Sequence, residues 1–507
     1  MSLPLSTIYP PVKKALLLFV FLFTTASTFG YDVTWSRELD DNSRFSYLKI
    51  LGATDNGYFI LRSNIAFDRG AEGSNFKNRR YLLQFFNASL NLSWEKEVQA
   101  AQENARIIDL QLISNQVLMI SYNDKPSGSG YEVYAQYISE EGNLKGNSVL
   151  LDDFPFVRFD DDRRPAIVFS KDRSKFAFTY RKADKEDSEQ TIIAVVMDTS
   201  LQKLYKKEWN IFSPIRRFSP THFLLTNESD FYLLGVQYTT DKRVKLPGES
   251  YFSISGHHNS SDRIIRHDIK LEGKFLTDIS IADDVLNHRL AVAGFYSETG
   301  MLASAGVFYT SLRKDSLTEA VIHFAPFTDE LLQKSISDRN DFRKKELFNY
   351  YIDRLLLRKD GGAAVIAESY VESSRTFWDY YTQTMITHTY YRYGNIIAAS
   401  FNPEGGMLWN NVIQKEQNSM DDDGYQSSYC SLITGGRFYA IFNKYIDRRS
   451  SVMIGWIDGQ GNQKTDILFE EAERITVIAR AAKQVDESTM IIPAFRQNRF
   501  YLAKVTF

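Results

Sequence analysis

The side chains that could do chemistry are few and scattered. Two neighbouring histidines, His257 and His258, could ligate a metal ion, but adjacent residues on an extended chain point to opposite faces, which is poor chelating geometry. Two acidic runs, at 160–162 and 421–423, lack the alternate spacing and the distal glutamate of a calcium loop. We expect both runs to be solvated loops, and we expect neither a metal nor a cofactor.

The sequence contains no nucleophile elbow, P-loop or HExxH helix. Carboxylates can converge in a folded channel from residues whose spacing in the sequence reveals nothing, so a hydrolase or lyase acting on glycans stays an alternative. The single cysteine, Cys430, excludes an intramolecular disulfide and a cysteine-based zinc site, and we expect a buried, inert thiol. Because no motif names a reaction, we expect a binding protein rather than an enzyme.

The segment 371–392 is the densest group of side chains suited to binding. Tyr, Trp and Arg dominate the hot spots of protein interfaces. The candidate binding residues are Arg375, Phe377, Trp378, Tyr380, Tyr381, Tyr391 and Arg392. The alternative is that these rings pack a helical insert at 327–349 onto the rest of the fold. The alternation of Tyr391 and Tyr393 indicates that part of the segment is strand.

Composition favours a large β-rich protein. The chain has 507 residues with 36 Phe and 29 Tyr, and aromatic side chains fit pleated surfaces. It carries 60 basic and 63 acidic residues, a formal net charge of −3. Since neither sign dominates, the charge balance argues against a nucleic-acid partner.

The N-terminus predicts export. Lys13 and Lys14 precede an apolar run at 15–23, and small and polar residues follow at 24–30. This order is typical of a secretory signal peptide. The run is too short to span a bilayer comfortably, although an uncleaved anchor is the alternative. We expect residues 1–30 to be removed. We expect the rest, 31–507, to form one domain without a membrane span, in the periplasm, at the outer-membrane periphery or outside the cell, as a monomer or part of a complex.

Short strands separated by turns fill the chain from Tyr31 onward. In the clearest unit, 395–415, an apolar run meets a turn and then a second strand with Trp409, and the unit 81–98 repeats this with Trp94. A period of about 60 residues with four strands per unit predicts an all-β fold, a single β-propeller. Outer hairpins are expected near 81, 131, 191, 263, 303, 395 and 452. We count eight four-stranded blades, or seven depending on the unit 217–281; two β-sandwiches are the alternative.

The two ends of the chain look like parts of one hairpin. The run 500–507 matches the first strand of an outer hairpin, and 31–39 matches the second strand, with Trp35 in the place of Trp94. We therefore expect the N- and C-terminal strands to complete the last blade together, which leaves no unpaired strand edge at the ends of the ring.

One face of the propeller should carry nearly all the elaboration. Links within hairpins are expected to be short, as at 55–57, 272–273 and 360–362. The long segments belong to the other face, at 65–79, 152–164, 239–262, 327–349, 371–392 and 414–427. The insertions 327–349, with one helix expected within 328–347, and 371–392 both belong to blade six. Long loops on a rigid scaffold are where binding usually occurs, so we expect this face to bind a protein or a glycan.

The segments Asn402 to Trp409 and Asn87 to Trp94 resemble the repeats of quinoprotein-type and WD-repeat-like propellers, in which such a Trp packs between blades. The resemblance is degenerate, since the unit 458–469 lacks the Trp. It implies the fold and no quinone chemistry. The segments 293–296 and 306–309 loosely resemble those of uncharacterised exported propeller-like proteins of Gram-negative bacteria, which implies no known activity. The expected function is that of an exported binding or scaffolding module.

Overall fold

The computed structural model describes residues 30–67, 79–125, 130–155, 165–182, 189–212, 218–261, 263–318, 322–336, 345–446 and 449–507. Residues 1–29, which hold nearly all of the expected signal peptide, lie outside these ranges, and so does the acidic run 160–162.

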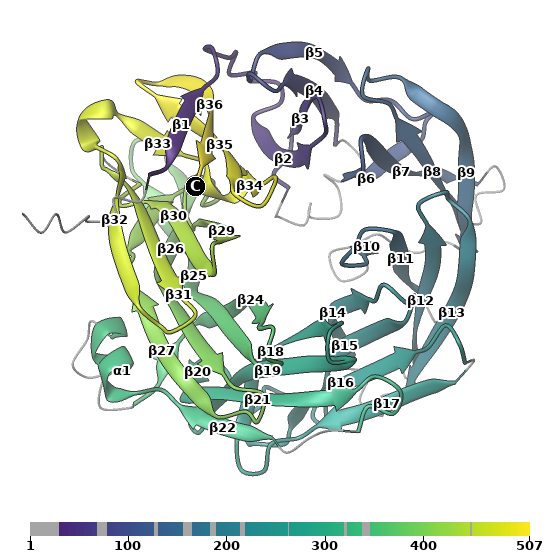
Figure 1. Cartoon of the computed structure of the whole chain (residues 1–507), viewed down its shortest axis with the longest axis vertical. Coiled ribbons are helices and arrows are strands. Elements are labelled where there is room, and N and C mark those ends of the chain that lie inside the picture. The colour runs from purple at the N-terminus through teal and green to yellow at the C-terminus, as the bar shows by residue number, and fades with distance from the viewer. Residues whose placement is uncertain are drawn as a thin grey trace, which may run out of the picture.

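Antiparallel sheets of four consecutive strands follow one another around a ring (Figure 1). Sheet one consists of β2 (Tyr47–Ala53), β3 (Gly57–Ser63), β4 (Tyr81–Asn87) and β5 (Leu92–Glu97). Sheet two consists of β6 (Arg106–Ile113), β7 (Gln116–Asp124), β8 (Gly130–Ile138) and β9 (Leu144–Pro155). Sheet three consists of β10 (Ala166–Phe169), β11 (Lys175–Lys182), β12 (Glu189–Asp198) and β13 (Lys203–Phe212). Sheet four consists of β14 (Phe218–Leu225), β15 (Phe231–Tyr238), β16 (Ser250–His257) and β17 (Ile264–Ile269).

The second half of the ring has the same construction. Sheet five consists of β18 (Phe275–Asp284), β19 (Arg289–Ser297), β21 (Gly306–Arg313) and β22 (His323–Pro326). Sheet six consists of β24 (Tyr350–Leu357), β25 (Ala363–Asp379), β26 (Thr384–Phe401) and β27 (Met407–Ile413), with β28 (Gln417–Met420) added on β26. Sheet seven consists of β29 (Cys430–Thr434), β30 (Arg437–Asn443), β31 (Val452–Asp458) and β32 (Gln463–Phe469). Sheet eight consists of β33 (Ile475–Val477), β34 (Lys483–Gln484), β35 (Thr489–Arg496), β36 (Arg499–Thr506) and β1 (Asp32–Trp35). The all-β propeller fold expected from the sequence is confirmed.

Burial explains which strands lie inside each sheet. All seven residues of β3 are buried, because this strand is covered on both faces by neighbouring sheets. The outer strand β5 (LSWEKE) is largely exposed and polar. Continuous apolar runs therefore mark the central strands and polar strands mark the rim, as packing of sheet faces requires.

The chain ends meet in sheet eight, as expected. Strand β1 pairs antiparallel with β36, with Val33 opposite Val505 and Trp35 opposite Ala503. The ring of Trp35 lies 5.4 Å from that of Phe469 in sheet seven and 6.2 Å from that of Tyr501. The N-terminal strand is therefore held by backbone pairing and by aromatic packing.

Two tryptophans of outer strands contact the next sheet. The indole nitrogen of Trp94 donates to the carbonyl of Glu140 at 3.0 Å, and that of Trp409 donates to the carbonyl of Gly459 at 3.1 Å. Gly461 has a φ of +86°, and a Cβ there would come within 2.7 Å of the Trp409 ring. This packing between sheets is what the repeat resemblance implies, and it requires glycine at the close approach.

Two expected links are wrong. Residues 272–273 connect β17 to β18 and so join two sheets rather than two strands of one hairpin. The segment 239–262, expected to be a long loop, contains the strand β16. The unit 218–269 is therefore one sheet, whose outer pair is β16–β17. A turn that contains Gly shows where the chain changes direction, but it does not show which strands pair. The link between β16 and β17, residues 258–263, contains no Gly, so the pattern did not mark this hairpin.

The expected helix is short. Helix α1 (Asp329–Ser335) begins after Thr328, whose hydroxyl accepts a hydrogen bond from the backbone of Leu331 at 3.2 Å. Leu331 and Leu332 are buried in the core between sheets five and six. Residues 337–344 lie outside the described ranges, and the two-residue strand β23 (Leu347–Phe348) then pairs with β20 (Ala303–Ser304).

Five innermost strands carry a β-bulge near the same point. The bulged residues are Leu51 in β2, Ile108 in β6, Thr221 in β14, Thr277 in β18 and Asp353 in β24. Bulges re-aim the residue that follows. In β18 that residue is Asp278, whose carboxylate accepts hydrogen bonds from the backbone of Ile352 in sheet six (2.6 Å) and of Ile279 (2.8 Å). Asp278 therefore couples sheets five and six.

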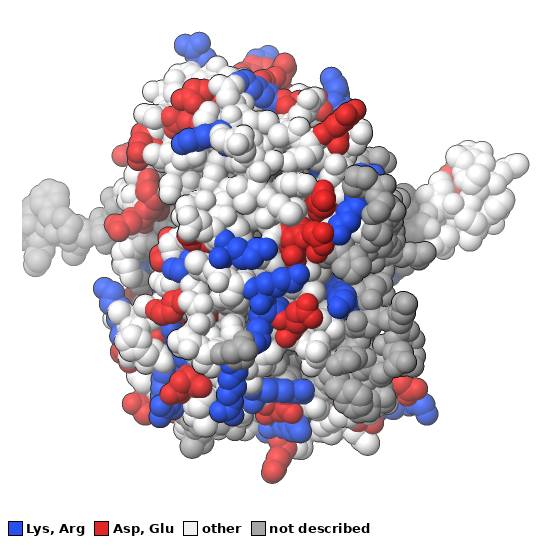
Figure 2. Space-filling model, turned by 90° about the vertical axis from the view of Figure 1, so that its right-hand side faces the viewer, with Lys and Arg blue, Asp and Glu red and all other residues white. Residues whose placement is uncertain are grey.

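The outer wall carries both signs of charge. Figure 2, which looks at the right-hand side of Figure 1, shows Lys and Arg along the middle of the wall with Asp and Glu on both sides of them. Lys206 of β13, for example, lies 2.9 Å from Asp152 of β9. No helix among the described residues is long and apolar enough to cross a membrane.

Trp35→Ala should lower the free energy of unfolding by about 2 kcal/mol, less than the loss for a fully buried Trp, because the ring is only partly buried. Trp378→Ala, which removes a ring that is 48% exposed, is the matched control and should leave stability unchanged. Urea unfolding measures both. Equal decreases in the free energy of unfolding of the two variants would contradict the role of Trp35 in stabilising sheet eight.

Asp278 should make stability depend on pH. Burial raises its pKa to about 6, against the effect of its two backbone hydrogen bonds. A carboxyl with a raised pKa stabilises the fold below its unfolded pKa of about 4, and this contribution is lost as pH rises through about 6. Relative to Asp278→Asn, the natural protein should lose about 3 kcal/mol between pH 4 and pH 6. Urea midpoints of the two proteins across this range measure the difference. Parallel pH profiles would show that Asp278 is ionised normally.

Candidate binding site

The segment 371–392 is a projecting β-hairpin. Strands β25 and β26 pair within sheet six and, past an irregularity at Ser369, continue pairing as far as Asp379 opposite Thr384. We call residues 371–392 the aromatic hairpin. It was expected to be an insertion that is only partly strand, but its backbone is a regular ladder on both sides of the turn.

The tip of the aromatic hairpin exposes large apolar side chains. Tyr381 is 99% exposed and Tyr380 84%, while Trp378 and Phe377 are 48% and 45% exposed. Met385, opposite Trp378, is 61% exposed. Rings this exposed do not pack the helical insert onto the propeller, which was the alternative. Four of the seven candidate residues therefore form an exposed apolar tip.

Both faces of the aromatic hairpin carry such side chains. Residues opposite one another in an antiparallel pair share a face. Trp378 and Met385 lie on one face, next to the hydrogen-bonded hydroxyls of Thr376 and Thr387 (2.8 Å). Phe377 lies on the other face, where it stacks on His388 with ring centres 5.2 Å apart. The tip is therefore a finger with apolar groups on two sides rather than a flat platform.

The remaining three candidate residues lie nearer the root. Arg375 is exposed, with its guanidinium 5.7 Å from the ring centre of Tyr390. Arg392 is exposed and lies 3.6 Å from Glu416. Tyr391, in contrast, is only 2% exposed, and its hydroxyl donates to Asp423 at 3.4 Å. Tyr391 therefore anchors the hairpin and does not form part of its surface.

A third strand stiffens the root of the hairpin. Strand β28 pairs with β26 from Tyr390 to Tyr393. Beyond it, the carboxylate of Asp421 accepts from the backbone of Thr389 at 2.8 Å and from Nδ1 of His388. The hydrogen bond from His388 lowers the pKa of Asp421. An isolated two-stranded hairpin is only marginally stable in water, so these contacts explain how this one is held in place.

A buried polar network lies beneath the root. Nζ of Lys415, fully buried, is 2.7 Å from the carboxylate of Glu368 and donates to the amide oxygen of Gln417 at 3.1 Å. Ser428 donates to Glu368 at 2.6 Å, and Gln417 donates to the carbonyl of Asn443 in sheet seven. Burial lowers the pKa of Lys415 and raises that of Glu368, and the attraction between the two opposes both shifts.

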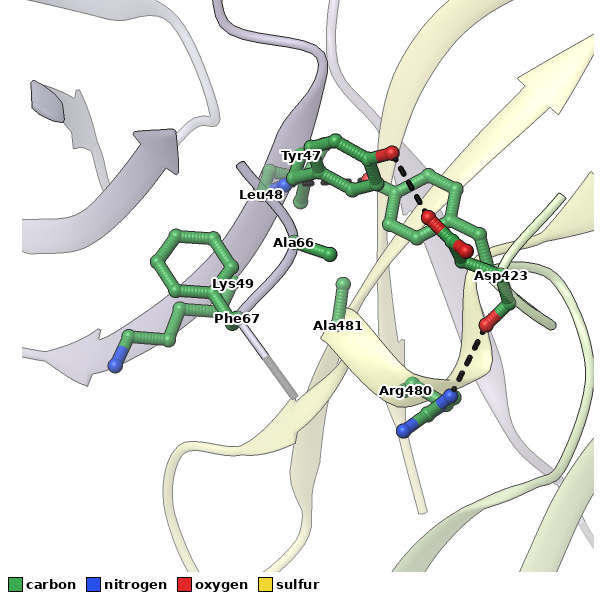
Figure 3. Close-up of a pocket in the computed structure, with 9 residues that line it drawn as sticks. Tyr47, Leu48, Lys49, Ala66, Phe67, Asp423, Arg480 and Ala481 are labelled. Carbon is green, nitrogen blue, oxygen red and sulfur yellow. Dashed lines mark hydrogen bonds between the residues drawn. The ribbon is translucent and has the colours of Figure 1, made fainter. Parts of the chain in front are cut away.

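Residues 421–428, which we call the strap, run from the hairpin root to sheet one. The hydroxyl of Tyr47 donates to the carboxylate of Asp423 at 3.1 Å, and the hydroxyl of Tyr425 accepts from the backbone of Leu48 at 3.2 Å. Figure 3 shows Asp423 between Tyr47 and Arg480. Nη1 of Arg480 donates to the Asp423 carbonyl at 3.5 Å and to the Tyr393 hydroxyl at 3.0 Å.

Arg480 lines three adjoining cavities. It belongs to the short 3-10 helix η4 (Ala479–Ala481), which interrupts the innermost strand of sheet eight. One cavity is the small pocket of Figure 3. The second, of about 440 Å³, is lined by the acidic residues Asp353, Glu368, Glu372 and Asp423. The third, of about 560 Å³, is lined by Arg354 and Lys483 as well as Arg480. The sequence alone does not reveal these residues as a group, because they come from four separate parts of the chain.

The alternative function, a hydrolase or lyase acting on glycans, requires carboxylates that lie close together, and the second cavity has four of them beside Arg480. Each of these carboxylates, however, is already engaged by a neighbour. Tyr429 donates to Asp353 at 2.5 Å and Tyr370 donates to Glu372 at 2.7 Å. Glu368 is neutralised by Lys415. The geometry therefore does not favour acid–base chemistry over binding.

The histidine pair does not converge. His257 is buried in β16 against the ring of Tyr205, at 4.8 Å, while Nδ1 of His258 lies 3.0 Å from Asp230. In the described ranges, no group of three His, Cys, Asp or Glu side chains could hold a metal ion. Cys430 is buried as expected, and burial raises the pKa of its thiol to about 12.

No protein-family model and no curated protein matches the sequence. Among solved structures, the chain is similar to the polysaccharide lyase Uly1 (10% identity, 91% of this chain and 99% of that one, TM-score 0.36). It is also similar to the WD40 domain of SCAP from fission yeast (9% identity, 94% and 98%, TM-score 0.36) and to prolyl oligopeptidase B from Galerina marginata (9% identity, 90% and 56%, TM-score 0.40). Scores this low carry no argument about function. The propeller class rests on the ring of four-stranded sheets.

Lys415→Met should destabilise the protein by about 3 kcal/mol or more, because it leaves the carboxylate of Glu368 buried without its counter-charge. The matched control is Lys464→Met, which breaks an exposed pair with Asp466 on the outer strand β32 and should change stability by less than about 1 kcal/mol. Urea unfolding at pH 7 compares the two. Similar decreases in the free energy of unfolding of the two variants would mean that the buried pair does not stabilise the root of the aromatic hairpin.

Proposed function

We propose that the chain is an exported binding module that engages a partner protein with the aromatic hairpin, on the face of the propeller that carries the long segments. The observation that carries this proposal is the exposure of Tyr380 and Tyr381, 84% and 99%, on a hairpin whose root is fixed. Clusters of exposed apolar side chains are costly in water and mark interaction sites.

The composition of the tip supports a protein partner. Tyr, Trp and Arg are the residues that contribute most at protein interfaces, and Tyr380, Trp378 and Arg375 supply all three types within six positions. Aromatic rings lose few rotamers on binding, so a pre-formed hairpin that presents them binds with a small loss of conformational entropy.

The shape of the tip supports insertion into a concave surface. Trp378 and Phe377 project from opposite faces of the ribbon, and the two tyrosines lie at its turn. A partner that contacts all of them must surround the finger, as a groove between protein elements does.

Export and the final location are part of the proposal. They rest on Lys13, Lys14 and the apolar run at 15–23. A partner would then be another protein of the envelope or of the surroundings of the cell. The scaffolding role follows from the ring itself, which holds the hairpin at a fixed place.

The double variant Tyr380→Ser, Tyr381→Ser should abolish partner capture, since truncating a hot-spot aromatic costs about 2 kcal/mol or more. A photo-crosslinking amino acid at position 385 in the natural background should give discrete protein adducts from envelope extract. The same crosslinker in the double variant should give at least tenfold less of them. Affinity of the purified partner, measured by titration, gives the quantitative test.

The matched control is Leu246→Ser, Leu286→Ser, which removes two apolar side chains of similar exposure (63% and 70%) outside the hairpin. It should leave capture unchanged. Equal adduct yields from the Tyr380, Tyr381 variant would overturn the proposal. Hairpin-dependent binding to glycans, without any protein adduct, would overturn the class of partner.

A further inference from the structure

Two positive side chains near the inner edge of sheet eight, Lys483 and Arg173, form no ion pair with a carboxylate in the described part of the chain. Nζ of Lys483 on β34 donates to the carbonyl of Leu51, the bulged residue of β2, at 2.6 Å. Arg173, from the turn between β10 and β11, donates to the carbonyl of Leu112 at 2.6 Å. Within the described ranges, neither cation has a carboxylate at ion-pair distance, so both are bonded to neutral backbone oxygens.

A cavity of about 560 Å³ adjoins Lys483. Its lining includes Arg354, Arg480 and Lys483, while Asp353 is its only acidic residue among those described. The carboxylate of Asp353 is engaged by the hydroxyl of Tyr429. Arg354 is exposed, and no hydrogen bond or ion pair joins it to any residue in the described part of the chain. The lining therefore has a net positive charge.

Positive side chains of other sheets, Arg173 and Lys49, also lie near Lys483. Burial, followed by the charges of Arg173 and Lys49, lowers the pKa of Lys483 to about 8. Lys49 has its own partner, Asp109, at 3.2 Å. A protein gains no stability from bringing like charges together, because the repulsion between them opposes folding. An anion in the cavity would remove this repulsion.

We propose that the cavity lined by Arg354, Arg480 and Lys483 binds the oxyanion group of a small molecule, a phosphate, sulfate or carboxylate. Two guanidinium groups and an ammonium supply donors that match such oxygens. The volume exceeds that of a bare oxyanion, so the cavity also holds part of the molecule that carries the group. This site is separate from the tip of the aromatic hairpin and does not depend on a protein partner.

Titration calorimetry of the purified protein at low chloride tests the proposal with three probes, inorganic phosphate, sulfate and citrate. At least one should bind with saturation, and the ranking of the three identifies the type of oxyanion. Lys483→Met and Arg354→Met should each weaken binding tenfold or more. Lys464→Met, on the outer wall, is the control and should bind as the natural protein does. No binding of any probe, or equal binding by the Lys483 and Lys464 variants, would overturn the proposal.

A second measurement separates binding from a purely structural role of Lys483. NMR of the ¹⁵N-labelled lysine side chain follows its pKa directly, without any substitution. The probe that binds should raise the pKa of Lys483 from about 8, since an anion favours the charged ammonium. A titration curve that the probe does not shift would mean that Lys483 serves only to join β34 to β2, and would overturn the proposal.

Discussion

The buried ion pair between Lys415 and Glu368 is the interaction on which the candidate sites depend. Its hydrogen-bonded neighbours extend through Gln417 to Asn443, and the side chain of Asn443 bonds the backbone of Val477, so a single network connects sheets six, seven and eight. An ion pair buried away from water adds little to the free energy of unfolding by itself. Removing one of its two charged side chains lowers that free energy strongly, because the other charge is left buried alone. The pair therefore determines how sheets six, seven and eight are arranged and adds little to their stability. Strand β28, which supports the aromatic hairpin by pairing with β26, begins two residues after Lys415.

The aromatic hairpin and the cavity lined by Arg354, Arg480 and Lys483 differ in the chemistry of their side chains. In the functions that we propose, the hairpin presents apolar rings to a large partner, while the cavity presents charged donors to a small one. Both are attached to the same network, because the strap that leaves the hairpin root at Asp421 reaches Arg480 through the carbonyl of Asp423. Packed elements that share hydrogen bonds have few independent arrangements. The root of the hairpin and the lining of the cavity thus share the strap as a common neighbour.

Periodicity in the sequence was enough for the fold, and local composition was enough for the more exposed part of the candidate site. Repeated hairpins with Trp94 and Trp409 predicted the propeller, and matching the two chain ends predicted the pairing of β1 with β36. The cluster of rings at 377–381 predicted an exposed surface, because the composition of a binding patch is local. Tyr391 was misplaced because a two-residue period tells which residues share a face but not what packs against that face. At Tyr391 the neighbour is Asp423 of the strap. The cavity residues Asp353, Asp423, Arg480 and Lys483 could not be found from sequence, since they meet only when the ring closes.

Pairing β1 with β36 has a consequence for how the protein is made. Synthesis from the N-terminus delivers Asp32–Trp35 long before Arg499–Thr506, although these segments hydrogen-bond to each other. The first strand must wait, unpaired, while the other sheets emerge. The ring can therefore close only after β36 has been synthesised. A product truncated before β36 keeps an open sheet edge that quality-control proteases or chaperones can recognise.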